Sequence, residues 1–116
     1  MSNKAETGAK GEQLAAEYLK DNGFEILEHN YRYRHAEIDI IAKKENLLIF
    51  VEVKTRTKID FGYPEEAVDG KKALKVNEGA EQFIYENDWT GDIRFDIISV
   101  VNGSETEIKH FEDAFY

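Results

Sequence analysis

Two short apolar segments of the sequence carry the side chains best suited to chemistry. Asp39 lies within residues 37–42, and Glu52 and Lys54 lie two positions apart at the end of residues 47–54. Two carboxylates offer the hard oxygen ligands that Mg²⁺ or a similar ion prefers. Such an ion polarises a phosphoryl oxygen, and a lysine stabilises the charge that builds on phosphorus. Asp39, Glu52 and Lys54 are therefore the smallest set expected for metal-dependent phosphodiester hydrolysis.

Two neighbouring strands are needed to bring these side chains together. Residues 37–42 and 47–54 are rich in Ile, Val and Phe, which favours strands, and the polar residues 43–46 between them predict a hairpin turn. Strand side chains alternate faces, so Glu37 shares a face with Asp39, and Glu52 shares one with Lys54. An even number of turn residues places Asp39 and Glu52 on the same side of the sheet, and an odd number places them on opposite sides.

Charged side chains at these positions favour a functional role over a solvated surface. A single acid on a strand usually faces solvent. Here one face must bury Ile and Val side chains, and the other face must cover Leu48 and Phe50, so unpaired charges would cost free energy. The residues expected to share the first buried face are Ile38, Ile40, Val51 and Val53.

The rest of the chain predicts a single α/β domain over residues 1–116 with a mixed sheet, because helical crossovers place some strands parallel. Gly23 is expected to cap the first helix at its C-terminus, and Asp69 to cap the second at its N-terminus. Ala73, Val76, Ala80, Phe83 and Ile84 should line one side of the second helix. The expected elements are a helix at 7–22, strands at 24–31, 37–42 and 47–54, a loop at 56–66, a helix at 69–87, a strand at 93–101 and an edge strand at 106–111.

The D…ExK arrangement, Asp39 followed by Glu52-Val53-Lys54, looks like the core motif of the PD-(D/E)xK nuclease superfamily. Over nearly the whole chain, the sequence more closely resembles the YraN family of endonuclease-like bacterial proteins. The longest matching stretches are Glu37-Ile38-Asp39-Ile40-Ile41-Ala42, Phe50-Val51-Glu52-Val53-Lys54 and Asp92-Ile93-Arg94-Phe95-Asp96. Shorter ones are Asn30-Tyr31-Arg32 and residues 11–12, 18–19, 23–24, 26–27, 61–62 and 66–68.

This resemblance implies a restriction-endonuclease-like three-layer sandwich with a central mixed β-sheet flanked by helices. It implies that Asp39 and Glu52 hold Mg²⁺ or Mn²⁺ and that Lys54 is the catalytic lysine. Glu12 takes the place of the helical acid and is a third expected ligand, although near a helix N-terminus it would also simply stabilise the helix. Glu37 completes the expected catalytic acids. The family usually has Gly where this chain has Ala36, which would be strained if a positive φ were required there.

The charge distribution bears on the partner. The net charge is -9, yet residues 32–75 carry ten Lys and Arg against eight acids, whereas residues 76–116 carry two against ten. A basic face can bind a polyanion even on an acidic protein, though the binding should weaken with salt. We expect nucleic acid, with DNA ahead of RNA, to contact Arg32, Arg34, Arg56 and Lys72.

The absence of cysteine excludes disulfides and thiolate metal sites. The three histidines lack the spacing of a zinc site. No apolar run is long enough to span a bilayer, so we expect a cytoplasmic protein without a membrane partner; the sequence does not specify its oligomeric state. The leading hypothesis is a metal-dependent endonuclease acting on DNA, with branched or flapped forms among its substrates. The alternative is a nucleic-acid-binding or protein-interaction module with a nuclease-like fold and little or no catalysis. Hydrolysis of RNA or a small phosphodiester is a third candidate.

Overall fold

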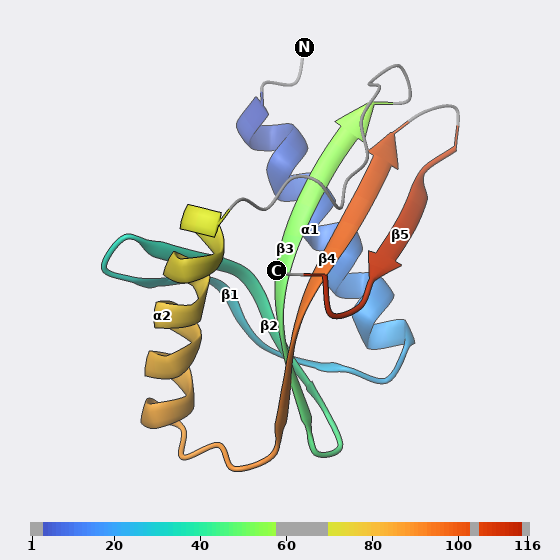
Figure 1. Ribbon diagram of the computed structural model, residues 1–116. Helices are drawn as coiled ribbons and strands as arrows, with labels where there is room; N and C mark the ends of the chain where they lie inside the picture. The colour runs from blue at the N-terminus through green and yellow to red at the C-terminus, as the bar shows by residue number, and fades with distance from the viewer. Residues whose placement is uncertain (1–3, 58–69, 103–104, 115–116) are drawn as a thin grey trace.

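A computed structural model describes residues 4–57, 70–102 and 105–114 of the chain. Two helices and five strands follow one another in the predicted order (Figure 1). They are α1 (Lys4–Asp21), β1 (Glu25–Tyr33), β2 (Ala36–Lys44), β3 (Leu47–Thr57), α2 (Gly70–Glu86), β4 (Asp92–Asn102) and β5 (Glu107–Phe111). Among these residues, no helix combines the length and the apolar character needed to cross a bilayer.

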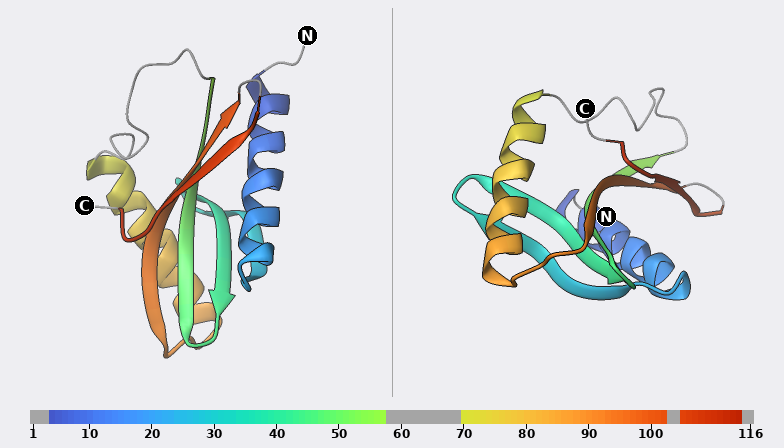
Figure 2. Two further views of the ribbon diagram at one scale, coloured as in Figure 1. Left: turned by 90° about the vertical axis from the view of Figure 1, so that its right-hand side faces the viewer. Right: turned by 60° about the horizontal axis from the view of Figure 1, so that its bottom comes forward.

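The strands form one sheet in the order β1-β2-β3-β4-β5. β3 and β4 pair in parallel, because α2 lies between them in the chain, and the other neighbouring pairs are antiparallel. α1 covers one face of the sheet and α2 covers the other (Figure 2). The predicted α/β sandwich with a mixed central sheet is thereby confirmed.

α1 ends where the sequence predicts. Gly23 has a φ of 89°, and its N–H donates to the Lys20 carbonyl. The Phe24 N–H donates to the Leu19 carbonyl at 2.9 Å. These two bonds satisfy carbonyls at the helix end that would otherwise lack partners, and the left-handed backbone they require suits glycine. The chain therefore turns sharply into β1, and Phe24 packs against the core beneath α1.

Each helix packs on its own hydrophobic cluster. The α1 cluster joins Ala15 and Leu19 to Ile40 and Val51, and the α2 cluster joins Phe83 to residues of β2 and β3. The predicted buried side of α2 is confirmed, with Ala73, Val76, Ala80 and Phe83 buried and Ile84 partly buried. Both faces of the central strands are covered, which is the environment inferred for the charged residues of the sequence.

Close packing joins each helix to the sheet through a glycine. A Cβ built on Gly11 of α1 would meet Thr55 Oγ1 of β3. A Cβ on Gly79 of α2 would lie 3.2 Å from the Ala36 Cβ. Ala36 is not among the described residues with a positive φ, so the departure from glycine there introduces no backbone strain.

Some boundaries differ from the sequence-based ones. β3 continues to Thr57, so Arg56 belongs to a strand rather than to the expected loop. Its extra residues pair with β4 throughout, as far as Thr57 with Asn102. The expected cap Asp69 and the loop segment 58–66 lie outside the described residues.

Candidate functional site

β2 and β3 separate at the position of Asp39. Their pairing runs from Lys44 opposite Leu47 to Ile40 opposite Val51. Beyond that point β2 continues along β1, whereas β3 continues along β4, and Figure 1 shows the β1–β2 hairpin turning away toward α2. The Asp39 carboxylate then replaces the backbone ladder, because its Oδ2 accepts the Val53 N–H at 2.8 Å. The candidate site lies at this fork.

The hairpin turn has two residues, Glu45 and Asn46, an even number, so the register sets Asp39 opposite Glu52. Asp39 and Glu52 are the next residues along the two strands after the last paired ones. Glu52 is only 5% exposed. Lys54 Nζ lies 3.4 Å from Glu52 Oε1, and the Lys54 side chain is 21% exposed. Glu52 and Lys54 thus form an ion pair beside the fork, and Asp39 accepts a hydrogen bond from the backbone of Val53, the residue between them.

One expectation for the buried faces is wrong. Ile40, Val51 and Val53 pack in or against the α1 cluster, as predicted, but Ile38 packs in the α2 cluster. Residues 38 and 40 would share a face in a regular strand, so β2 rotates about its own axis at Asp39. The rotation follows from the fork, since β2 leaves β3 there and follows β1 toward α2.

Glu12 reaches toward this region from α1. The Asn30 side chain of β1 donates a hydrogen bond to the Glu12 carboxylate. Burial raises the pKa of the Glu12 carboxyl above its ordinary value; the Asn30 hydrogen bond and nearby His29 lower it, while the negative charges of Glu37 and Glu52 raise it. The sum is a raised pKa. The predicted catalytic acids Glu37 and Glu52 are therefore close enough for their charges to act on the Glu12 carboxyl.

Glu37 has a more exposed place than the other acids. Its Oε1 lies 3.6 Å from a terminal nitrogen of Arg32, with side-chain exposures of 47% for Glu37 and 74% for Arg32. An ion pair this exposed contributes little to stability. Arg32 and Glu37 lie directly opposite one another on β1 and β2, so both remain near the fork.

The carboxylates at the fork suit an ion such as Mg²⁺, which needs few protein ligands, better than an ion that requires a cage made only of protein ligands. Within the described part of the chain, no group of three or more His, Cys, Asp and Glu residues is arranged to hold a metal. Mg²⁺ usually needs only one or two carboxylates, and takes waters and substrate phosphates as its remaining ligands. Asp39 and Glu52 supply two hard carboxylates of this kind, and Glu12 is the further acid in the vicinity.

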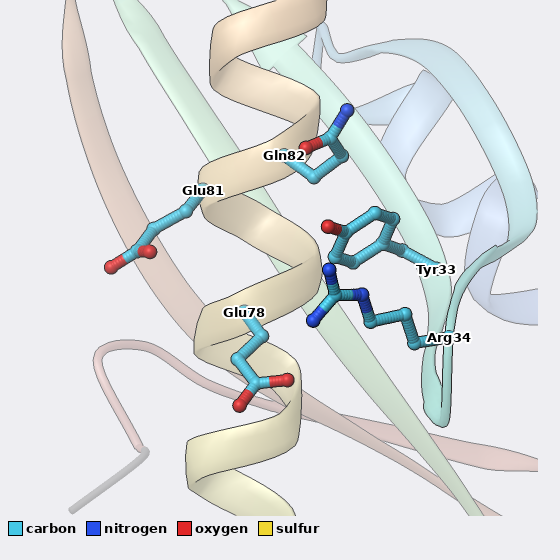
Figure 3. Close-up of a pocket in the computed structure, with 5 residues that line it drawn as sticks. All are labelled: Tyr33, Arg34, Glu78, Glu81 and Gln82. Carbon is cyan, nitrogen blue, oxygen red and sulfur yellow. The ribbon is translucent and has the colours of Figure 1, made fainter.

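The predicted phosphate contacts lie in different places. Arg56 stands two residues beyond Lys54 on β3, and its Nε is buried with no hydrogen-bond partner among the described residues. Arg34 lies in the β1–β2 turn with its guanidinium carbon 5.2 Å from the centre of the Tyr33 ring. Figure 3 shows the side chains of Tyr33 and Arg34 directed toward α2. They line a hollow of about 340 Å³ that Glu78 and Glu81 also line. The side chain of Lys72 lies outside the described residues.

A second charged cluster, centred on Asp96 of β4, was not predicted as such. Asp96 is fully buried. It accepts two hydrogen bonds from Arg94, at 2.8 and 2.9 Å, one from the Asp113 N–H at 3.0 Å, and it lies 2.7 Å from His110 Nε2. The Tyr18 hydroxyl of α1 lies 3.1 Å from His110 Nδ1. The cluster ties α1, β4, β5 and the following turn together.

Burial alone would raise the pKa of the Asp96 carboxyl, but the hydrogen bonds from His110, Arg94 and Asp113 outweigh burial and hold this pKa below its ordinary value. Asp96 is thus kept ionised by its partners. A sequence signal was present, since an acid stands in the run of residues 95–101, whose other members are apolar except for Ser99. The partner His110 could not be identified without the sheet pairing that brings β5 beside β4.

Comparisons with known proteins were made on the sequence and on the fold. The model of the Uncharacterised protein family UPF0102 matches residues 11–100. A UPF0102 protein of Flavobacterium psychrophilum is 46% identical over 117 residues, covering 100% of this chain and 98% of the relative. One of Clostridioides difficile is 48% identical over 116 residues, covering 99% and 100%. Among solved structures, Pyrococcus furiosus SfsA in complex with Ca²⁺ is similar with a TM-score of 0.37 and 14% identity, covering 91% of this chain and 62% of that one.

Proposed function

Because this chain belongs to the UPF0102 family, which is the YraN family that its motifs resemble, we propose that it is a metal-dependent endonuclease hydrolysing phosphodiester bonds in DNA. Mg²⁺ or Mn²⁺ is its proposed cofactor. The single observation that supports the proposal is the fork between β2 and β3, where Asp39 binds the backbone N–H of Val53, between the paired Glu52 and Lys54.

Burial of the fork supports a catalytic rather than a structural use of its charges. Glu52 is 5% exposed, and its Oε1 lies 3.4 Å from Lys54 Nζ. Removing a charged group from water costs free energy, so charged side chains in the central sheet of a small fold point to a function that requires them. Positions where burial and neighbouring charges combine in this way are candidates for function.

Each residue at the fork has a proposed role. Asp39 and Glu52 hold the cation, with Glu12 as a third acid from α1. When bound, the cation supplies Lewis acidity toward a phosphoryl oxygen. Lys54 donates to the phosphoryl group as negative charge builds on it. Arg56, two residues beyond Lys54 on β3, binds a neighbouring phosphate of the DNA backbone.

The test is cleavage of linear, branched and flapped DNA in Mg²⁺ or Mn²⁺ by the native protein and by Lys54→Met. Methionine keeps most of the volume of lysine but removes its charge. We expect Lys54→Met to retain Mn²⁺ binding and lose cleavage by about a hundredfold or more, the loss typical of a group that stabilises a transition state. The matched control is Lys109→Met on exposed β5, which should cleave like the native protein.

Two results would contradict the proposal. One is the absence of cleavage by the native protein on every DNA form with either metal. The other is equal cleavage by Lys54→Met and the native protein, which would point to a contaminating nuclease.

A binding module with little or no catalysis is the second candidate. The observation that favours it is that the acids at the fork already have partners within the protein. Asp39 accepts the Val53 N–H, and Glu52 pairs with Lys54. The net charge of -9 also favours it. Calorimetric titration with Mn²⁺ separates the two candidates. The endonuclease should bind the ion and lose that binding in Asp39→Asn, whereas the module should bind its partner equally well in both proteins.

A further inference from the structure

Asn30 has an unusual backbone conformation for its position. Its φ is 51°, although it lies in the interior of β1. The other non-glycine residues with positive φ in the described ranges are all in turns, namely Arg34, Glu45, Asp88 and Asp113. Left-handed backbone in a non-glycine residue costs about 1 kcal/mol or more, and it persists only where the surrounding structure requires it. A turn does not explain the conformation of Asn30.

The sheet register places Asn30 beside the candidate site. His29 pairs with Ile40 and Tyr31 pairs with Ile38, so Asn30 stands opposite Asp39 across the β1–β2 ladder. This is the point where β2 rotates and leaves β3. The left-handed residue on β1 and the fork on β2 therefore occur at the same level of the sheet.

The Asn30 side chain points toward α1 and Glu12. It donates a hydrogen bond to the Glu12 carboxylate. Both side chains line a hollow of about 350 Å³ between α1 and β1, together with His29 and Lys20. The hollow gives solvent and ions access to Glu12, while the hydrogen bond fixes where its carboxylate points.

We propose that Asn30 is a positioning residue that fixes the Glu12 carboxylate on the α1 side of the fork, so that Glu12 serves as a ligand of a divalent cation bound there. The inference rests on the proposed function of the fork. It explains why β1 keeps a left-handed asparagine in a strand. The amide must leave the regular pleat to reach Glu12, and asparagine tolerates this backbone better than most residues do. Partners that orient metal ligands in this way typically change metal affinity by 10–100-fold.

The test is a double-mutant cycle on Mn²⁺ affinity measured by calorimetry, with Asn30→Gly, Glu12→Gln and the double variant. Glycine at position 30 adopts the same backbone without strain, so the melting temperature should hold or rise while the hydrogen bond is lost. We expect Mn²⁺ binding about tenfold weaker in Asn30→Gly. The double variant should bind no more weakly than Glu12→Gln, because Asn30 acts only through Glu12.

Glu45→Gly is the matched control, since Glu45 has a φ of 54° in the β2–β3 turn and lies away from Glu12. It should relieve the same kind of strain and leave Mn²⁺ affinity unchanged. In nuclear magnetic resonance spectra without metal, the Asn30 side-chain amide signals should move in Glu12→Gln and stay in place in the exposed-site variant Glu17→Gln.

The outcomes separate the two proposals. If the native protein binds no Mn²⁺, the function proposed for the fork and this inference fail together. If the native protein binds Mn²⁺ and Asn30→Gly binds it equally well, or if the two single effects multiply in the double variant, only the role of Asn30 is overturned. Unmoved Asn30 amide signals in Glu12→Gln would also overturn it, because the contact itself would be missing.

Discussion

Replacing Asp96 by Asn should destabilise the fold strongly, although the two side chains have nearly the same shape. Asp96 is fully buried and receives two hydrogen bonds from Arg94, one from the Asp113 N–H and a contact from His110. An Asn amide group would place a donor against donors on one side, and it would remove the buried charge partner of Arg94 and leave only the exposed Glu112, 3.5 Å away. Breaking a buried charge pair from one side costs about 3–5 kcal/mol.

The lower end of this range is the better estimate, because the Arg94 side chain is 22% exposed and water can solvate part of it. A loss of about 3 kcal/mol should lower the melting temperature by about 12 °C, since a domain of this length loses roughly 4 °C per kcal/mol. Urea unfolding followed by circular dichroism measures the free energy of unfolding directly. Asp92→Asn, at an exposed position on the same strand, is the control and should change it by less than about 0.5 kcal/mol.

The pH dependence gives a sharper check. The folded-state pKa of the Asp96 carboxyl is lowered from the ordinary value of 3.8. A lowered pKa contributes stability that is full above pH 3.8 and is lost as the pH falls through the folded-state value. The native protein should therefore lose this contribution in acid, while Asp96→Asn has none to lose. The stability difference between them should shrink as the pH falls below about pH 4. A difference under 1 kcal/mol at pH 7, or one that does not shrink in acid, would refute this reasoning.

Two further predictions concern packing and DNA binding. Gly11→Ala should destabilise the protein by about 1–3 kcal/mol in chemical unfolding, because the new methyl group meets Thr55 Oγ1. Adding Thr55→Ala to the same chain should recover most of the loss. A stabilised single variant would contradict the close approach of α1 to β3. Arg56→Ala should weaken DNA binding and reduce by about 1 the slope of log affinity against log salt, measured by fluorescence anisotropy, and an unchanged slope would show that Arg56 contacts no phosphate.

The sequence predicted the elements of this fold well, because each depends on local patterns. Apolar periodicity located both helices, and Gly23 marked the end of α1 through a backbone conformation that glycine favours. The two-residue turn at Glu45 and Asn46 follows from a short polar segment between two β-branched runs. The positions of Asp39 and Glu52 on neighbouring strands follow directly from that turn.

Local sequence patterns did not predict the features that depend on contacts between residues far apart in the chain. The rotation of β2 at Asp39 arises because β1 and β4 draw the two central strands apart, so Ile38 packs on the face opposite to the expected one. Tyr18 and His110, which complete the Asp96 cluster, are 92 positions apart. The left-handed backbone of Asn30 has no signal within the strand itself, since the neighbouring residues of β1 pair regularly with β2.

The bond from the Val53 N–H to Asp39 Oδ2 means that this carboxylate also completes the architecture of the sheet. A partly buried N–H deprived of its acceptor costs about 1–3 kcal/mol, so Asp39→Ala would weaken the junction of β2 and β3 as well as any chemistry there. Asparagine keeps an oxygen that can accept the same N–H. The sheet itself therefore accepts Asp or Asn at this position more readily than Ala, whatever chemistry the fork performs.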